Sequence, residues 1–334
     1  MAGDALTLLT GATGFVGSAV ARVLAARGHR LRLLVRPMSD RRNLAGLDAE
    51  LVLGDLTDEA SLARAVAGCR YLFHVAADYR FWVPDPEAML RANVDGTVAV
   101  MRAAQAAGVE RIVHCSSVAA LGWTHDGSPA NETTPTNEAD FIGPYKRSKF
   151  LAERAVMDLV RQEGLPAIVV NPSAPVGPRD IKPTPTGKMV RDAAAGRVPA
   201  YIDTGLNMVH VDDVAEGHAL ALEKGQIGER YVLGGENLLL KDILALIAEV
   251  AGRRPPRIEV PEPVLWPAAW FMEGLARVTG IPPIMTRDQI KMARHKMFYS
   301  SARAMRELGY SPRPLRLAIE DAVAWFRANG RLPT

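Results

Sequence analysis

The chain has 334 residues, of which 48% are hydrophobic and 23% are charged, and its 40 basic and 37 acidic side chains leave a net charge of +3. This composition supports a large buried core, and the near balance of charge argues against a nucleic-acid-binding protein. No apolar stretch reaches the about 20 residues that span a bilayer, and residues 1–4 lack the basic start of a signal peptide. We therefore expect a soluble protein of the cytoplasm.

The first half of the chain alternates strand-like and helix-like segments at the spacing of βαβ units. Short apolar stretches predict strands at 6–10, 30–35, 50–53, 70–75, 111–116 and 166–171. Helical patterns lie between them at 15–27, 58–67, 86–107 and 144–163. Strands that are apolar throughout are typical of a parallel sheet buried on both faces. The predicted fold class is α/β, a Rossmann-type doubly wound parallel sheet of five to seven strands.

The pattern changes after Pro172, where five prolines fall within fourteen residues. Helical patterns then follow at 187–196, 211–224, 240–251, 263–278 and 314–328, with short strands near 208–211 and 230–233. We predict a dinucleotide-binding domain over 1–172, to which a segment at about 208–233 returns. Most of 173–334 should form a smaller substrate-binding lobe over the carboxyl ends of the strands, where open α/β sheets bind ligands.

A glycine-rich turn, Thr10-Gly11-Ala12-Thr13-Gly14-Phe15-Val16-Gly17, joins the first strand to the first helix. Glycines allow the backbone to approach a pyrophosphate, and the helix N-terminus supplies free N–H groups and a positive dipole. A strand before the turn and a helix after it favour a dinucleotide site over a purely structural glycine run. The expected cofactor contacts in this turn are Gly11, Thr13, Gly14, Phe15, Val16 and Gly17.

Arg36 follows the second strand, at the position where an acidic residue would bind the adenosine 2′-hydroxyl. An arginine there, with Ser39, Arg41 and Arg42 close behind, instead suits a 2′-phosphate. We predict NADP(H) rather than NAD, with Arg36 and Ser39 as cofactor contacts. The alternative is a solvated basic loop.

Residues after the third and fourth strands complete the predicted cofactor site. Asp55, followed by Leu56, is placed to meet the adenine amino group, and the small Ala76 and Ala77 let the backbone approach the cofactor. The alternative for Asp55 is an N-cap of the helix predicted at 58–67.

The segment Tyr145-Lys146-Arg147-Ser148-Lys149 carries the predicted chemistry, because Tyr145 and Lys149 share one helix face. Catalysis near pH 7 requires the tyrosine pKa of about 10 to fall by roughly three units, which an adjacent ammonium and an oxidised nicotinamide ring could supply. Ser116-Ser117 ends the fifth strand, and a hydroxyl there can hydrogen-bond the substrate oxygen. The alternative is an amphipathic helix with an incidental tyrosine and lysine.

These motifs stand in the order found in the extended short-chain dehydrogenase/reductase family, which the chain resembles over nearly its whole length. They are TGATGFVG, GDL, ANVDGT, SSV, YKRSK, Asn171-Pro172 and HVDDVA. The resemblance implies that Ser117, Tyr145 and Lys149 are the catalytic triad and that Asn93 supports the site. It also places Tyr145, Lys149 and Pro172 against the cofactor.

The stretches RPMSDRRNL and VAADYRFW make the chain most similar to hopanoid-associated sugar epimerases, with dihydroflavonol reductases as near relatives. Two differences from related families narrow the range of expected substrates. Val118-Ala119 stands where sugar-nucleotide 4,6-dehydratases carry Asp-Glu, and Leu206 stands where nucleotide-sugar epimerases carry an arginine that grips the diphosphate. The resemblance therefore favours neither of these activities.

Aromatic residues after the fourth strand, Tyr79, Phe81 and Trp82, are candidates to wall the substrate site, together with Trp123. The alternative is that they cover edges of the core. The apolar stretch 263–271 is expected to be lobe core or a homodimer face, and the alternative is a peripheral membrane contact. The basic run from Arg287 to Lys296 is expected to be a solvated face.

Cys69 and Cys115 are expected to be buried thiols, because two isolated cysteines in apolar settings rarely form a disulfide. No His, Cys, Asp or Glu cluster has metal-ligand spacing. The sequence thus predicts an NADP(H)-dependent oxidoreductase that acts on a carbonyl or carbinol of a hydrophobic or sugar-bearing small molecule, in hopanoid biosynthesis by the resemblance. The alternatives are a sugar epimerase that retains its cofactor and a non-catalytic NADP sensor.

Overall fold

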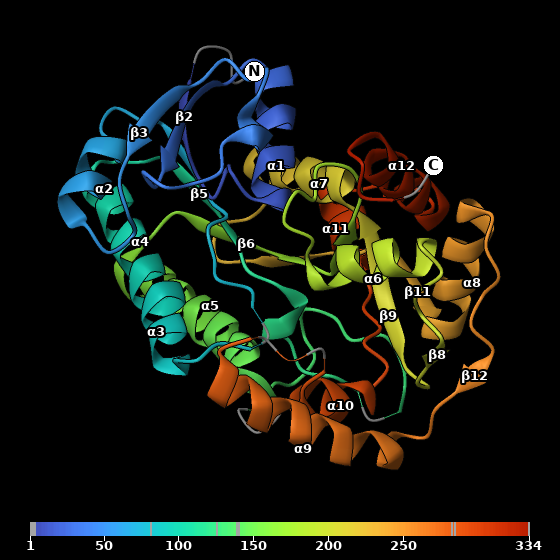
Figure 1. The fold of residues 1–334 in the computed structure, drawn as a ribbon. Helices are drawn as coiled ribbons and strands as arrows, with labels where there is room; N and C mark the ends of the chain where they lie inside the picture. Colours follow the sequence, from blue (N-terminus) through green and yellow to red (C-terminus); the bar gives the residue numbers. More distant parts are fainter. Residues whose placement is uncertain are drawn as a thin grey trace.

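The computed structural model describes residues 5–80, 82–124, 126–137, 141–281, 283 and 285–332. Seven parallel strands form one sheet in the order β3-β2-β1-β4-β5-β6-β10 (Figure 1). The strands are β1 (Leu6–Thr10), β2 (Arg30–Val35), β3 (Glu50–Leu53), β4 (Tyr71–His74), β5 (Arg111–Cys115), β6 (Ala167–Pro172) and β10 (Arg230–Leu233). The predicted Rossmann-type sheet is confirmed.

Helices cover both faces of this sheet. One face carries α1 (Phe15–Ala26), α7 (Val211–Lys224) and α11 (Ala302–Leu308), and the other carries α2 (Glu59–Val66), α4 (Gly96–Ala106) and α5 (Gly143–Glu163). Successive strand residues point to opposite faces, so Leu9 and Val113 lie in one core while Leu8 and Ile112 lie in the other. Each fully buried leucine or isoleucine contributes about 1.5–3 kcal/mol, which explains why these strands are apolar throughout.

Short irregular helices connect these elements: η1 (Arg42–Leu44), α3 (Pro86–Leu90), η2 (Arg91–Asp95) and η3 (Val118–Ala120). The segment predicted as a helix over 86–107 is helical from Pro86 to Ala106, but a π-helical turn, η2, lies between α3 and α4. Such turns occur frequently at functional sites.

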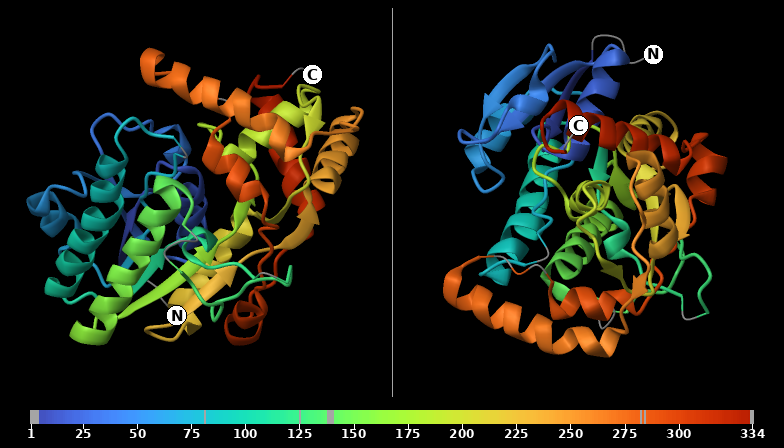
Figure 2. Two further views of the ribbon diagram at one scale, coloured as in Figure 1. Left: turned by 90° about the horizontal axis from the view of Figure 1, so that it is seen from below. Right: turned by 45° about the vertical axis from the view of Figure 1, so that its right-hand side comes forward.

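The rest of the chain forms a smaller lobe with its own core. Its strands are β7 (Ala174–Val176), β8 (Ala200–Tyr201), β9 (Gly205–His210), β11 (Glu236–Leu239) and β12 (Ile258–Glu259). Its core helices are α6 (Pro185–Ala194), α8 (Leu240–Ala251) and α12 (Leu315–Ala328), and α9 (Glu262–Thr279) and α10 (Arg287–Ala293) lie outside them. Figure 2 shows α9 along the outer edge of the molecule. The sequence pattern did not predict the short strands β7, β8, β11 and β12 or the seven-residue helices α10 and α11.

Cys69 and Cys115 are both buried free thiols, as predicted. Across the described residues, no helix combines the length and the apolar character that crossing a membrane requires.

Candidate active site

The turn between β1 and α1 is built on close backbone contacts. Gly11 has a φ of 78°, and a Cβ there would lie 2.6 Å from the Ala76 nitrogen. A Cβ on Gly17 would lie 2.1 Å from the Gly11 carbonyl oxygen. Glycine is therefore required at both positions. Gly14 is the N-cap of α1, and no side chain caps this helix end, so the turn presents a helix N-terminus suited to an anion.

A buried chain of hydrogen bonds holds this turn against β4 and α4. The Nδ1 and Nε2 atoms of His74 lie 2.8 and 2.9 Å from the hydroxyls of Thr10 and Thr97. The Thr10 hydroxyl also accepts from the amides of Val75 and Ala76, each at 3.2 Å. Burial lowers the pKa of His74 to about 3, so the ring is neutral and links the two threonines.

The predicted cofactor residues outside the glycine turn, α1 and α5 lie at or beyond the carboxyl ends of strands in the large sheet. Asp55 and Leu56 follow β3, Ala76 and Ala77 follow β4, and Pro172 ends β6. The Asp55 carboxylate accepts from the Thr57 amide and hydroxyl, whereas Asp58 caps α2. The N-cap alternative for Asp55 is therefore wrong, since the N-cap is Asp58, three residues later.

Arg36 is exposed just beyond β2, in the same turn as Ser39, whose amide donates to the Arg36 carbonyl. Hydrogen bonds from Thr57, with a smaller contribution from the Arg36 charge, hold the pKa of Asp55 below its usual value. Arg36 thus lies near the adenosine side of the predicted site. Arg42, by contrast, is paired with Asp40 at 2.6 Å.

Asn93, in the π-helical turn η2, connects two parts of the site. Its side chain accepts from the Asp78 amide at 2.7 Å and donates to the Asp78 carbonyl at 2.8 Å and to the Ser148 hydroxyl at 2.9 Å. These bonds hold the loop after β4 against α5.

Helix α5 begins at Gly143-Pro144, where Gly143 has a φ of 84° and proline suits the first turn. Tyr145 and Lys149 lie one turn apart on it. Lys149 is only 4% exposed, and its ammonium donates to the Cys115 carbonyl at 2.8 Å, which fixes α5 against the end of β5. Burial lowers the pKa of Lys149.

Ser117 and Tyr145 are hydrogen-bonded through their side chains. The Ser117 hydroxyl also accepts from the Ala119 amide at 3.1 Å, which caps η3. The neighbouring Ser116 is buried, and its hydroxyl has no partner in the described part of the chain. Of the two serines, Ser117 is the one joined to Tyr145.

The protein environment raises, rather than lowers, the pKa of Tyr145. Burial raises it to about 12, although the Ser117 hydrogen bond acts in the opposite direction. The Lys149 charge does not offset this rise, and the Lys149 ammonium donates to the Cys115 carbonyl. The phenol is therefore protonated at neutral pH.

A second polar network anchors α5 to the far edge of the sheet. Glu153, buried one turn beyond Lys149, accepts from Asn171 at 2.6 Å and from Arg230 at 2.9 Å. Arg230 also donates to the Glu132 carbonyl at 2.7 Å. This network fixes the rotation of α5, and with it the direction of Tyr145.

A cavity of about 480 Å³ lies at the N-terminal end of α5. Trp82 lines it together with Pro144, which directly precedes Tyr145, and Ala276 and Arg277 of α9. Tyr79 is partly exposed nearby in sequence, and Phe81 lies outside the described residues. The cavity thus brings one predicted wall residue, Trp82, to the start of α5.

Trp123 does not face this cavity. It is buried, its ring stacks on His295 at 4.3 Å, and the Lys146 ammonium lies 4.1 Å from the ring centroid. For Trp123 the structure supports the alternative of a ring that covers the core.

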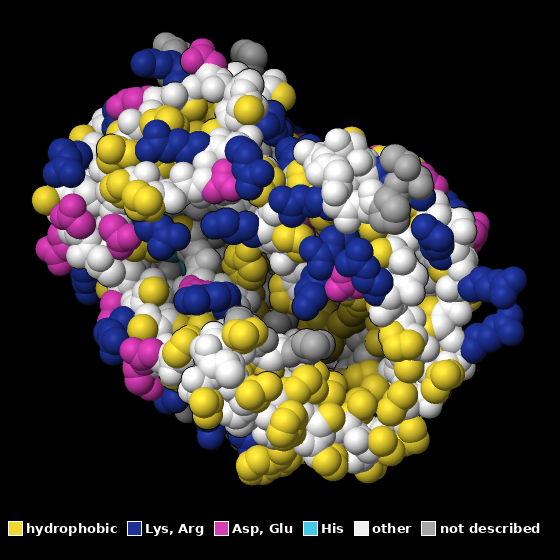
Figure 3. All heavy atoms as spheres, in the orientation of Figure 1, with side chains coloured by type: hydrophobic (Ala, Val, Ile, Leu, Met, Phe, Trp, Pro, Cys, Tyr) yellow, Lys and Arg dark blue, Asp and Glu magenta, His cyan; other side chains and the backbone are white. Residues whose placement is uncertain are grey.

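Helix α9 turns its two glutamates toward the α10 segment and exposes most of its large apolar side chains. Glu262 and Glu273 bind Arg294 and Arg287 of the neighbouring α10 segment, each pair at 2.8 Å. The large apolar side chains that α9 exposes are Val264, Trp270, Phe271, Leu275 and Val278. Phe271 is 73% exposed and Val278 86%, and hydrophobic side chains fill this edge of the surface in Figure 3. The stretch is therefore not lobe core. Arg287 is partly buried in its ion pair, whereas Lys291, Arg294 and Lys296 are exposed, so most of the basic run is solvated as predicted.

Leu206 lies in β9 and packs against the core of the smaller lobe. A leucine there supplies no cation to a diphosphate. No group of three or more His, Cys, Asp and Glu side chains in the described ranges is arranged to hold a metal ion.

Comparison with known proteins identifies the family. Residues 7–234 match the NAD dependent epimerase/dehydratase family. The chain is 42% identical to a putative dihydroflavonol 4-reductase of Synechocystis sp., with 98% of this chain and 96% of that protein covered. It is 36% identical to sterol demethylase protein B of Methylococcus capsulatus, with 98% and 99% covered. It is 32% identical to a farnesyl-dihydroquinoline-oxide ketoreductase of Stigmatella aurantiaca, with 92% of each covered.

The crystal structure of gox2253 superimposes with a TM-score of 0.90 at 61% identity, covering 99% of this chain and all of that chain. The fold is thus a Rossmann-type dinucleotide-binding fold. The chain belongs to the NAD-dependent epimerase/dehydratase family, within the extended short-chain dehydrogenases/reductases.

A pH dependence of stability follows from His114 of β5. This ring is buried beside His74 at a centroid distance of 5.4 Å, and neither of its nitrogens has a hydrogen-bond partner among the described residues. Burial, followed by the Lys149 charge, lowers its pKa well below 6.5. Below pH 6.5 the unfolded chain binds a proton that folded His114 does not, so the wild type loses stability as the pH falls.

We predict that His114→Leu becomes more stable relative to wild type by up to about 1.4 kcal/mol per pH unit below 6.5. Urea unfolding at pH 7.5, 6.0 and 5.0 measures this difference. A difference that stays constant over this range would refute the assignment.

Proposed function

We propose that the protein is an NADP(H)-dependent oxidoreductase that acts on a carbonyl or carbinol of a hydrophobic or sugar-bearing molecule. The observation that carries this proposal is the hydrogen bond between Ser117 and Tyr145, one helical turn from the buried ammonium of Lys149. Two relatives are named as reductases. Their names support net reduction over the alternative, a sugar epimerase.

The residues at the strand ends fit a dinucleotide. The uncapped N-terminus of α1 and the glycines before it suit a pyrophosphate. Arg36 and Ser39 suit a 2′-phosphate, and the other residues that would hold the cofactor are Asp55, Leu56, Ala76, Ala77, Lys149 and Pro172. When bound, the nicotinamide group supplies or accepts the hydride.

Tyr145 would act as the proton donor in reduction. Its raised pKa keeps the hydroxyl protonated at neutral pH, so a proton is available for the substrate oxygen as negative charge develops there. The Ser117 hydroxyl would donate a hydrogen bond to the same oxygen. Lys149, held by the Cys115 carbonyl, would orient the cofactor ribose beside Tyr145.

An apolar substrate fits the surroundings of Tyr145. The cavity beside Pro144 has an apolar side formed by Trp82, Val83 and Ala276 and a charged side formed by Glu273, Arg277, Arg287 and Asp288. Leu206 supplies no cation for a diphosphate. Two relatives are named for a sterol and a farnesyl-bearing compound. A hopanoid precursor is the first candidate, and common UDP- and GDP-sugars should bind weakly or not at all.

The apolar outer face of α9 would place the protein on a lipid surface, where such substrates partition. Aromatic and aliphatic side chains on one helix face, flanked by cations, are typical of interfacial helices. The exposed cations are Arg277 on α9 and Arg253, Arg254 and Arg257 just before it. Their charge complements anionic lipid headgroups.

We predict that Tyr145→Phe binds NADPH like the wild type but loses 10²–10⁴-fold in turnover, because only the proton donor is removed. Lys149→Met should weaken both turnover and NADPH binding. The rate of NADPH oxidation with a panel of polycyclic ketones and aldehydes measures turnover. The control is Tyr71→Phe, because Tyr71 lies at the amino end of β4, away from the carboxyl ends of the strands. Retention of more than a tenth of the activity in Tyr145→Phe would exclude this role. Cofactor that stays bound through purification, with no net oxidation, would favour an epimerase.

We predict that NADPH binds more tightly than NADH, and that Arg36→Asp weakens NADPH binding about ten- to a hundredfold. Loss of a charge-assisted contact to the 2′-phosphate removes about 1.5–3 kcal/mol. Calorimetric titration of wild type and Arg36→Asp with both cofactors tests this. Arg64→Asp is the control, because Arg64 is an exposed arginine of α2. Equal affinities of the wild type for the two cofactors would contradict the prediction.

We predict that the protein floats with vesicles that contain anionic lipid and that Phe271→Ser with Val278→Ser reduces the bound fraction at least fivefold. Leu317→Ser, an exposed apolar residue of α12, is the control. A dimer that dissociates in the α9 variant, without vesicle binding by the wild type, would instead make α9 a subunit interface.

A further inference from the structure

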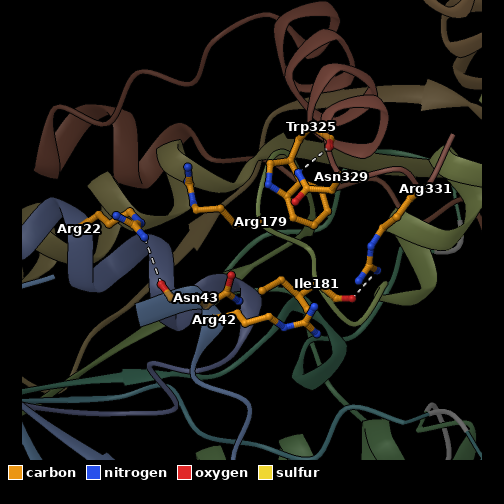
Figure 4. A pocket seen from close by; sticks show the side chains of 8 residues that line it. All are labelled: Arg22, Arg42, Asn43, Arg179, Ile181, Trp325, Asn329 and Arg331. Carbon is orange, nitrogen blue, oxygen red and sulfur yellow. Dashed lines mark hydrogen bonds between the residues drawn. The ribbon is translucent and has the colours of Figure 1, made fainter. Parts of the chain in front are cut away.

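Four arginines from different parts of the chain surround a cavity of about 210 Å³ between the two lobes. Arg22 comes from α1 and Arg42 from η1, on the side of the large sheet. Arg179 follows β7, and Arg331 follows α12, on the side of the smaller lobe. Figure 4 shows their side chains around this space. None of the described side chains that line the cavity is acidic.

The existing contacts leave part of this donor set unused. Arg22 donates to the carbonyls of Asn43 and Ala45 at 3.1 and 3.0 Å, and Arg179 is paired with Asp212. The Nε–H groups of Arg22 and Arg179 are nevertheless buried without a partner in the described part of the chain. A buried unpaired donor costs about 1–3 kcal/mol, and more when it is charged.

The same two guanidinium groups repel each other. Burial, followed by the Arg179 charge, lowers the pKa of Arg22. Arg179 also has a φ of 74°, the only left-handed φ of a non-glycine residue in the described ranges. Strained backbone conformations of this kind cluster at ligand sites. The repulsion between these like charges is relieved by an anion in the cavity.

We propose that this cavity binds a phosphate group, held between the two lobes by Arg22, Arg179 and Arg331. Guanidinium groups match phosphate oxygens in pairs. The volume suits a phosphate or diphosphate and is below the about 300–1,000 Å³ of sites for larger ligands. Because each lobe contributes arginines, the bound group ties the lobes together.

The phosphate has two possible sources. Asn43 lines the cavity and donates to the carbonyls of Thr13 and Gly14, at 3.2 and 3.4 Å. The cavity therefore adjoins the glycine turn, and a phosphate of the dinucleotide is one source. A separate phosphate or diphosphate ion is the other, and that source does not depend on the proposed function.

Calorimetry with inorganic phosphate and diphosphate, in the presence and absence of saturating NADPH, tests this proposal. We expect binding below 1 mM that weakens at least tenfold in Arg179→Gln and in Arg331→Gln, and not in Arg64→Gln. Binding that persists with NADPH assigns the site to a separate ion. Binding that NADPH abolishes, with NADPH affinity at least tenfold weaker in both variants, assigns it to the cofactor.

The proposal fails if neither ion binds to wild type at 10 mM and if NADPH affinity is unchanged in the two variants. Thermal unfolding of each variant without ligand checks that it folds. Because the ion titrations need no turnover, an inactive enzyme that still binds phosphate separates this result from failure of the proposed function.

Discussion

A Cβ at residue 17 would stand 2.1 Å from the Gly11 carbonyl oxygen, and a Cβ at residue 11 would stand 2.6 Å from the Ala76 nitrogen. This three-way backbone contact joins β1, α1 and the loop after β4, and no side chain fits between them. The neutral ring of His74 extends the contact to Thr97 of α4. The edge of the sheet that carries the predicted cofactor residues is thus fixed by backbone packing.

Helix α5 is placed by equally specific polar contacts. The Lys149 ammonium holds it to the end of β5, Asn93 holds Ser148, and Glu153 reaches Asn171 and Arg230. Each of these groups is buried and charged or polar, so a shift of α5 would leave it unpaired at a cost. Tyr145 and Ser117 meet because α5 has a single well-satisfied position.

The large sheet and the glycine turn could be predicted from the sequence, because apolar strands at βαβ spacing and a glycine-rich turn between a strand and a helix are strong local signals. The short strands of the smaller lobe could not, since two to four residues carry too little periodicity. The raised pKa of Tyr145 comes from burial, which does not follow from the spacing of Tyr145 and Lys149 in the sequence. The arginine cavity draws on four segments, Arg22, Arg42, Arg179 and Arg331, that only the fold brings together.

The order of the strands also constrains how the chain folds. The face of the sheet formed by Leu9, Val113 and Ile168 is covered by α7, and its edge strand is β10. Both come from residues beyond 210, and Ala304 and Leu308 of α11 close the same core. A chain emerging from the ribosome therefore lacks α7 and the edge strand until residue 233 has been made, and α11 closes this core only at residue 308. Folding of the large sheet must wait for these distant contacts, and until then the nascent chain is exposed to aggregation.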